Sequence, residues 1–267
     1  MGLAPFSHDG IESVRVANLS LHTTVIAQLE QQEDAVMSSL RARFQSFGKE
    51  LEFELQRFAL LWRYQHHVPP FTLWWRLVLK RTFDVVASIA LVAVFSPVML
   101  VVAALIKCTS AGPVFFMQER MGRFGQTFRM AKFRTMVRDA EASTGPVWCS
   151  PEADPRVTRV GKFLRRTHLD ELPQLFNVMA GEMSLVGPRP ERQFFVEQLA
   201  ESIPSYDQRL FVKPGMTGLA QVHYRYDQTI GDVKRKLRFD LLYVRRMCLM
   251  LDVRILAWTV QIGRAHV

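Results

Sequence analysis

Two adjacent carboxylates, Asp170 and Glu171, stand near the middle of this 267-residue sequence. They follow a basic stretch that contains Arg165, and they precede a segment expected to form a short helix. A carboxylate pair flanked by cations and helix amides is suited to binding a metal ion and a phosphate, and to attacking phosphorus. The same residues also fit an ordinary helix cap, in which Asp begins the helix and Glu favours its dipole. The segment alone leaves both interpretations open.

Three other segments carry side chains suited to holding an anion. Lys132 and Arg134 alternate along a predicted strand, where alternate side chains point the same way and could grip a phosphate together. Arg189 stands between two prolines that stiffen its backbone, so its guanidinium would be a good anion clamp. Gln221 follows a Pro-Gly turn and adds a polar side chain. Taken alone, each segment also fits a solvated strand face or a plain loop.

An uncharged, apolar run covers residues 85–106. At roughly 1.5 Å per residue, a helix of this length could cross a bilayer core of about 30 Å. Pro97 removes the amide that would bond to the carbonyl of Ala93, so the helix should break or bend there, and the Ser96 hydroxyl can satisfy part of the freed backbone. Cations flank both ends of the run, and positive residues tend to stay in the cytoplasm. A re-entrant hairpin broken at Ser96-Pro97 satisfies both observations, and a kinked spanning helix is the alternative.

The N-terminal segment shows a long helical pattern. From His22 to Arg63, apolar residues recur at steps of three and four, which predicts an amphipathic helix that ends before Pro69 and Pro70. Such a stripe is typical of a packed core or of a helix-pairing seam. It favours self-association of the chain into a homo-oligomer, or contact with the membrane surface.

Composition narrows the class of partner. The formal net charge of +9 implies an anionic partner, which could be nucleic acid, anionic lipid or a phosphorylated substrate. We see no nucleic-acid-binding motif and no glycine-rich strand-turn-helix fingerprint, so we predict neither a nucleic-acid partner nor a Rossmann nucleotide fold. The three cysteines have no metal or redox spacing and are expected to be reduced thiols. The N-terminus lacks the pattern of a secretory signal, and nothing suggests export.

Taken in order, these segments resemble one family closely, the bacterial sugar transferases. These are monotopic polyprenyl-phosphate phosphoglycosyl transferases that begin the assembly of exopolysaccharide, capsule, O-antigen or related glycans. The resemblance runs from about Leu79 to Leu256. It rests on six motifs, namely Lys80-Arg81-Thr82-Phe83-Asp84, Phe95-Ser96-Pro97, Lys132-Phe133-Arg134-Thr135-Met136, Leu169-Asp170-Glu171-Leu172-Pro173-Gln174-Leu175-Phe176-Asn177, Val186-Gly187-Pro188-Arg189-Pro190 and Lys213-Pro214-Gly215-Met216-Thr217-Gly218.

The resemblance implies a role for each candidate residue. Asp170 would be the nucleophile on the phosphate next to the sugar of a nucleotide-activated donor, with Glu171 as its metal ligand or acid/base partner and Mg²⁺ as the cofactor. Lys132 and Arg165 would lie near substrate phosphates, and Arg189 would belong to the nucleotide-side loop. The implied substrates are a UDP-sugar and undecaprenyl phosphate, at a bacterial inner membrane with the active site on its cytoplasmic face.

Two departures from the family pattern leave the preferred sugar open. Leu219 stands where the family often has Trp, and residues 223–226 differ from the commoner Asn-Gly form. Two alternative functions also stay open. In one, the lipid phosphate attacks the donor directly, while Asp170 and Glu171 only hold metal. In the other, the chain is a non-catalytic, membrane-anchored scaffold that acts through its N-terminal helix.

We therefore expect an α-rich α+β protein with four parts. A helical extension would occupy residues 1–70, a re-entrant membrane helix residues 71–108, and a small cytosolic catalytic domain residues 109–261. Two short strands around a glycine-bearing turn, within residues 112–130, predict a β-hairpin in that domain. Residues 262–267 look like translated sequencing adapter and are expected to be a non-native tail.

Overall fold

The computed structural model describes Gln65, residues 69–138, Ala140, and residues 154–224 and 229–264. The chain divides into two compact units, Met1–Phe58 and Ala59–Val267, and all the helices and strands described below belong to the second. The predicted N-terminal amphipathic helix and its self-association seam lie outside the described residues. The last helix runs to Arg264, so the second half of the predicted non-native tail also lies outside them.

The apolar run forms part of one long helix, α2, which spans Pro70–Thr109. Pro70 suits the first turn, where its missing N–H would have no helical partner. Within the described part of the chain, Phe71–Thr109 is the single helical stretch long and apolar enough to cross a membrane.

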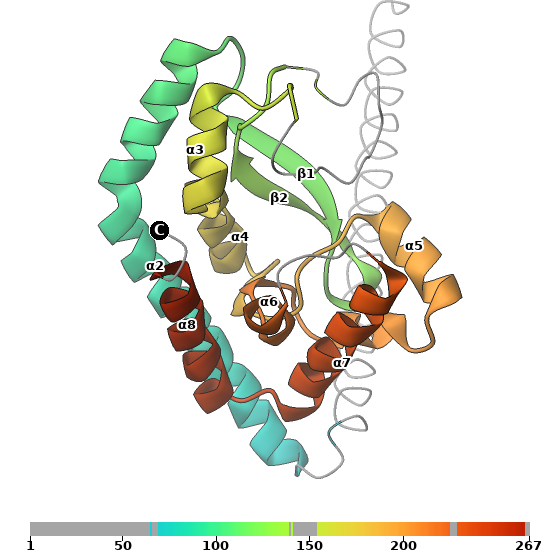
Figure 1. Ribbon diagram of the computed structural model, residues 1–267. Helices are drawn as coiled ribbons and strands as arrows, with labels where there is room; N and C mark the ends of the chain where they lie inside the picture. The colour runs from blue at the N-terminus through green and yellow to red at the C-terminus, as the bar shows by residue number, and fades with distance from the viewer. Residues whose placement is uncertain (1–64, 66–68, 139, 141–153, 225–228, 265–267) are drawn as a thin grey trace, which may run out of the picture. The chain divides into compact units, whose positions relative to one another are not determined.

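The predicted break in α2 is a bend within one continuous helix. Pro97 lies inside the helix, and Ser96 Oγ donates a hydrogen bond of 3.0 Å to the carbonyl of Ala93. That carbonyl is the one that Pro97 leaves without an amide partner, so the predicted role of the Ser96 hydroxyl is confirmed. Figure 1 shows α2 changing direction midway rather than running as one straight rod. The re-entrant topology itself stays a prediction.

Both arms of α2, before and after Pro97, are attached to the part of the chain that follows this helix. In the first arm, Arg81 donates to the carbonyls of Val178 and Met179, at 2.6 and 2.9 Å, near the end of helix α4 (Gln174–Ala180). The second arm contributes to a buried core made of Met99, Val102, Ile106, Phe133 and Leu164. The stretch between these attachments exposes a series of large apolar side chains, including those of Val86, Ile89, Leu91, Val94 and Val98.

A β-hairpin follows α2, as predicted. Strand β1 (Phe115–Met121) pairs antiparallel with β2 (Thr127–Phe133) through the short helical turn η1 (Arg123–Gly125). A second sheet was not predicted from the sequence: β3 (Ser184–Val186) pairs in parallel with β4 (Gly215–Thr217). Strands of three residues are too short to show an alternating pattern, so no local signal predicts them.

Helices make up most of the remaining described chain, which confirms an α-rich α+β class. They are α3 (Arg159–Thr167), η2 (Leu169–Glu171), α5 (Gln193–Ser202), η3 (Tyr206–Phe211), α6 (Leu219–His223), α7 (Ile230–Arg246) and α8 (Leu249–Arg264). A second buried core joins β1, α5, η3 and α7 through Met121, Val196, Ile203, Tyr206, Val233 and Leu237. The two cores hold the hairpin between α2 on one side and the C-terminal helices on the other.

Candidate active site

The carboxylate pair lies in a tight turn between two helices. Helix α3 ends at Thr167, and His168 adopts a left-handed backbone (φ 56°) that turns the chain into η2, where Asp170 and Glu171 lie. Helix α4 begins three residues later, with Pro173 at its N-cap and no side-chain cap hydrogen bond. Neither carboxylate therefore caps a helix, and the capping interpretation is wrong.

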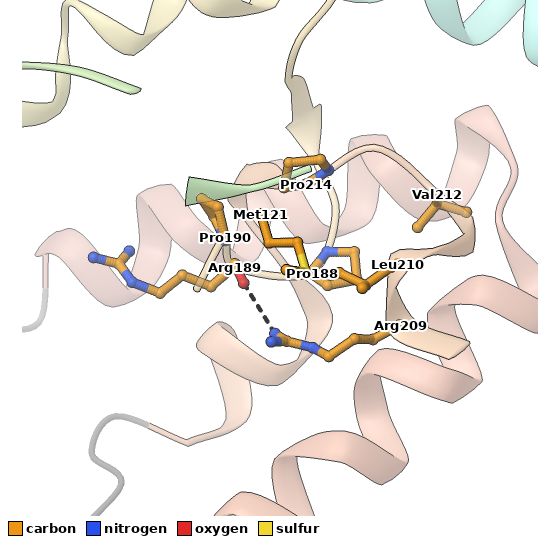
Figure 2. A pocket seen from close by; sticks show the side chains of 8 residues that line it. All are labelled: Met121, Pro188, Arg189, Pro190, Arg209, Leu210, Val212 and Pro214. Carbon is orange, nitrogen blue, oxygen red and sulfur yellow. Dashed lines mark hydrogen bonds between the residues drawn. The ribbon is translucent and has the colours of Figure 1, made fainter. Parts of the chain in front are cut away.

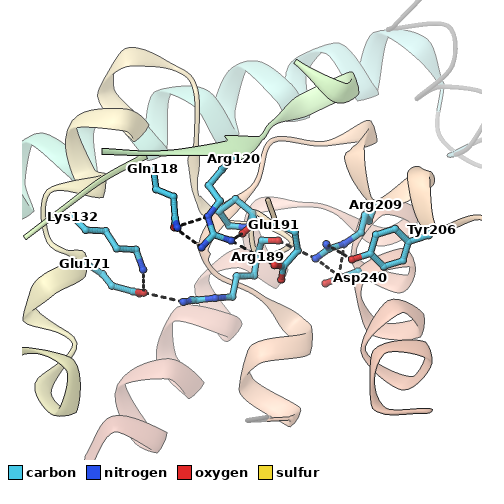
Figure 3. Close-up of polar contacts among 10 residues, drawn as sticks. Gln118, Arg120, Lys132, Glu171, Arg189, Glu191, Tyr206, Arg209 and Asp240 are labelled. Atoms are coloured by element: carbon cyan, nitrogen blue, oxygen red, sulfur yellow. Dashed lines mark hydrogen bonds and ion pairs between the residues drawn. The ribbon is translucent and has the colours of Figure 1, made fainter. Parts of the chain in front are cut away.

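Glu171 is held by two cations from distant parts of the chain. Its Oε1 accepts hydrogen bonds from Lys132 Nζ at 2.8 Å and from Arg189 Nη2 at 3.0 Å (Figure 3). Burial alone would raise the pKa of Glu171, but Arg189 and Lys132 outweigh it and hold the pKa well below its usual range. Glu171 is therefore ionised at any physiological pH.

Asp170 differs sharply from its neighbour. Its residue is 8 % exposed, yet its carboxylate makes no hydrogen bond or ion pair with any residue in the described part of the chain. Burial and the negative charge of Glu171 raise the pKa of Asp170, while Lys132 and Arg165 oppose that rise. Two neighbouring carboxyl groups whose environments push their pKa values apart are suited to different chemical roles.

Asn177 explains how Lys132 reaches Glu171. From α4, its Oδ1 accepts from the backbone N–H of Ala131 at 2.9 Å, and its Nδ2 donates to the carbonyl of Arg129 at 2.8 Å. These bonds dock α4 on the open edge of β2, beside Lys132. This role of Asn177 was not predicted from the sequence, because its partners lie in a strand more than forty residues earlier.

The loop that carries Arg189 is held by long-range hydrogen bonds as well as by its prolines. Four carbonyls from residue 186 to residue 190 accept hydrogen bonds from other parts of the chain. The carbonyl of Val186 accepts from Tyr243 at 2.9 Å and from Lys80 at 3.2 Å. The carbonyls of Pro188, Arg189 and Pro190 accept from the N–H of Gly215 at 2.9 Å, from Arg209 at 2.9 Å and from Arg120 at 3.1 Å, respectively. The predicted stiffness of this loop thus has a tertiary cause.

A small hollow lies beneath the Arg189 loop and is lined by Met121, Pro188, Arg189, Pro190, Arg209, Leu210, Val212 and Pro214. Figure 2 shows the Arg189 side chain extending away from this hollow, while its carbonyl faces Arg209. Arg209 forms a buried ion pair with Asp240 at 2.9 Å and donates to the Tyr206 hydroxyl at 3.0 Å (Figure 3). Arg209 and Asp240 lie 31 residues apart, and no local pattern pointed to either.

Arg165 and Gln221 lie near this centre in different ways. Arg165 lies near enough to Asp170 to act on its charge, and its Nε donates to the hydroxyl of Thr135 at 2.9 Å. Gln221 donates to the carbonyl of Met216 at 3.3 Å and lines a second hollow together with Arg189, Glu191, Tyr206, Arg209, Lys236 and Asp240, among others. The structure thus brings Asp170, Glu171, Lys132, Arg165 and Arg189 together, and it places Gln221 beside Arg189.

Arg134 turns away from the carboxylate pair. Its Nη1 donates to the carbonyl of Ala111 at 2.9 Å, and its Nη2 donates to the carbonyl and the hydroxyl of Ser110 at 2.9 and 2.7 Å. These bonds satisfy backbone groups just after the C-terminus of α2. Lys132 and Arg134 therefore have different partners in this structure, and their joint binding of one anion stays a prediction.

The sequence matches the family described as Bacterial sugar transferase over residues 75–265. The chain belongs to the bacterial sugar transferase family. It is 43 % identical over 183 residues to UDP-N-acetylgalactosamine-undecaprenyl-phosphate N-acetylgalactosaminephosphotransferase of Aeromonas hydrophila. The matched region covers 68 % of this chain and 43 % of that protein. It is also 43 % identical over 186 residues to UDP-glucose:undecaprenyl-phosphate glucose-1-phosphate transferase of Klebsiella pneumoniae. That match covers 69 % of this chain and 40 % of the relative.

A third member of the sugar transferase family matches over nearly its whole length. The exopolysaccharide production protein PSS of Rhizobium leguminosarum bv. phaseoli is 43 % identical over 192 residues, covering 69 % of this chain and 94 % of that protein. The first two relatives are matched over less than half of their length. The matched part of this chain includes the carboxylate pair, the hairpin and the Arg189 loop, so the site lies wholly within the family region.

Lys132 and Arg134 offer a matched pair of substitutions in this family member. Arg134→Met should remove three hydrogen bonds from a charged donor, which are worth about 1.5–3 kcal/mol each at most, and should lower the melting temperature by roughly 5 °C or more. Lys132→Met should instead have a smaller thermal effect, since Glu171 keeps Arg189 as a partner. Thermal melts check both variants. Equal thermal losses would contradict the assignment.

Proposed function

We propose that this chain moves a sugar 1-phosphate from a UDP-sugar to undecaprenyl phosphate. The names of two relatives give these two kinds of substrate for other members of the family. The observation that carries the proposal is Asp170, a mostly buried carboxylate without a partner among the described residues, beside a Glu171 that two cations hold. Cations are required at such a site because a donor diphosphate repels an attacking carboxylate.

The proposed reaction proceeds in two displacements at one phosphorus atom. A carboxylate oxygen of Asp170 attacks the phosphorus that bears the sugar, and the bond to the bridging oxygen breaks, so its electron pair leaves with UMP. A sugar-phosphoryl aspartate remains. An oxygen of undecaprenyl phosphate then attacks the same phosphorus and displaces Asp170, which yields undecaprenyl-diphosphate-sugar. Splitting the transfer lets one site use a soluble donor and a lipid acceptor in turn.

The residues around Asp170 fit a magnesium ion. Mg²⁺ in proteins is usually bound by one or two carboxylates together with substrate phosphates and water. The Asp170 oxygens and Glu171 Oε2 have no partner among the described residues, so these are the atoms that would hold it. No group of three or more His, Cys, Asp or Glu side chains placed to hold a metal occurs in the described ranges. Substrate phosphate and water would therefore fill the remaining coordination positions of the ion. Bound Mg²⁺ would supply neutralisation of the diphosphate charge.

The attachment of α2 supports a re-entrant membrane helix. A helix that spans the bilayer places its two ends on opposite sides, whereas both arms of α2 pack against one catalytic body. The exposed apolar stretch lies between these attachments, around the bend at Pro97. Trp74 and Trp75 are exposed on the first arm. Tryptophan is enriched at the level of the lipid headgroups, so their position fits the membrane surface. The catalytic body then lies at the cytoplasmic face of the inner membrane, where a soluble donor and a lipid carrier meet.

A donor panel tests the proposed function. Membranes containing the chain are incubated with undecaprenyl phosphate and with UDP-glucose or UDP-N-acetylgalactosamine, the donors named for its relatives, and with further UDP-sugars. We expect UMP release together with a lipid-linked sugar diphosphate from at least one donor, and only when the acceptor is present in a multiple-turnover assay. Absence of both products with every donor would contradict the proposal, as would steady UMP release that is independent of the lipid.

A further inference from the structure

Thr135 touches Arg165 through its hydroxyl group. The residue is 7 % exposed and lies directly after Arg134, where the chain leaves β2. Its Oγ1 accepts a hydrogen bond of 2.9 Å from Arg165 Nε, on the last turn of α3. We propose that this bond aims the Arg165 guanidinium at the phosphates of the donor, which makes Thr135 a positioning residue. The inference rests on the proposed function for its substrate.

The backbone of Thr135 is fixed independently of its side chain. Its carbonyl accepts from the N–H of Thr158 at 3.0 Å and from the Thr158 hydroxyl at 3.2 Å, where α3 begins. Gly161 packs so closely that a Cβ there would collide with the Thr135 carbonyl oxygen. The neighbouring residue Met136 forms an antiparallel bridge with Val157. Removal of the Thr135 hydroxyl therefore leaves α3 docked by its backbone contacts.

The hydrogen bond to Thr135 uses only one of the three guanidinium nitrogens of Arg165. Nε is engaged, while Nη1 and Nη2 make no hydrogen bond or ion pair with any residue in the described ranges. Arg165 lies on the last turn of α3, and the turn at His168 leads directly from that helix into η2, which carries the proposed nucleophile Asp170. A planar guanidinium anchored at Nε presents its two terminal nitrogens as a fork, the geometry that binds phosphate oxygens in pairs.

The electrostatic setting favours an anion at this fork. Lys132 and Arg189 are both bound to Glu171, and each carries an ion pair with that carboxylate. Arg165 has no such carboxylate partner among the described residues, so its charge is available to a ligand. A side chain as flexible as arginine would lose orientation without an anchor, and a misplacement of about 1 Å in a site of this kind costs about 10²-fold in rate. Thr135 supplies the anchor from a rigid segment.

A pair of substitutions isolates the hydroxyl. Thr135→Val keeps the shape and removes the acceptor, whereas Thr135→Ser keeps the acceptor. We expect Thr135→Val to lower kcat/KM for the UDP-sugar by about 10- to 100-fold, and to weaken binding of UDP measured by calorimetry. Thr135→Ser should stay close to the wild type in both. The melting temperatures of the two variants should match, since the backbone contacts of Thr135 are retained.

A double-mutant cycle shows whether the effect acts through Arg165. Arg165→Lys removes the fork and Nε but keeps the charge, so Thr135→Val added to it should cause no further loss. Equal UDP binding and equal kcat/KM for Thr135→Val and Thr135→Ser would overturn the inference. So would an undiminished loss from Thr135→Val in the Arg165→Lys background. If the wild type binds UDP but transfers no sugar, the proposed function fails, and the binding comparison still decides the role of Thr135.

Discussion

Asp170→Asn is expected to lower the rate of UMP release by at least about 10⁴-fold, the scale seen when a covalent nucleophile is removed. The amide is nearly isosteric with the carboxylate, but it is neutral and a poor nucleophile. Because Asp170 makes no hydrogen bond or ion pair with a described residue, the substitution breaks no contact and the fold should be retained. Initial rates with the best UDP-sugar measure the loss.

An exposed aspartate provides the control for this substitution. Asp207 lies in η3 and is exposed, so Asp207→Asn should retain wild-type transfer and wild-type melting behaviour. An Asp170→Asn enzyme that is fully active would instead favour direct attack by the lipid phosphate, with the carboxylates holding only metal.

Asp240→Ala is expected to cost about 3–5 kcal/mol of unfolding free energy, because it leaves the buried charge of Arg209 without its partner. The substitution should also reduce transfer in the protein that remains folded. Arg209 bonds to the carbonyl of Arg189, so a displaced Arg209 releases the loop whose side chain holds Glu171. Denaturant melts and transfer rates check the two effects separately.

Two comparisons sharpen the Asp240 prediction. Arg235 is 64 % exposed and 3.9 Å from Asp232, so Arg235→Ala should change stability by no more than about 0.5 kcal/mol. The double substitution Arg209→Met with Asp240→Leu should recover much of the stability, because apolar replacement of a buried pair is often neutral. Its transfer rate should stay low, since the Arg189 carbonyl has lost its donor. Full activity in that double variant would contradict a role for Arg209 in holding the loop.

The sequence predicted which side chains gather at the candidate site better than it predicted the contacts that hold them there. Asp170 and Glu171 are neighbours, so one short motif pointed to both. Strand alternation pointed to Lys132, the flanking prolines pointed to Arg189, and the resemblance to the family pointed to Arg165. The hairpin and the bend at Pro97 were predictable because strand alternation and the missing proline amide act locally.

The elements around the site are held by long-range contacts, which no local sequence pattern encodes. Lys80 bonds to Asp252 at 2.7 Å across 172 residues, and Tyr243 bonds to Val186 across 57. Arg134 alternates with Lys132 in the sequence, yet its guanidinium bonds to Ser110 and Ala111, just after the end of α2. Tertiary packing decided each of these cases.

The most direct test of the central claim is a search for sugar phosphate bound covalently to Asp170. The chain is mixed with a UDP-sugar labelled in the phosphate next to the sugar, without lipid acceptor, and is quenched in denaturant within one turnover. The account predicts one labelled phosphate per active site, located by mass spectrometry on the peptide that contains Asp170, released by undecaprenyl phosphate and absent from Asp170→Asn. Steady transfer by an enzyme that never carries this label, or a label on another residue, would contradict it.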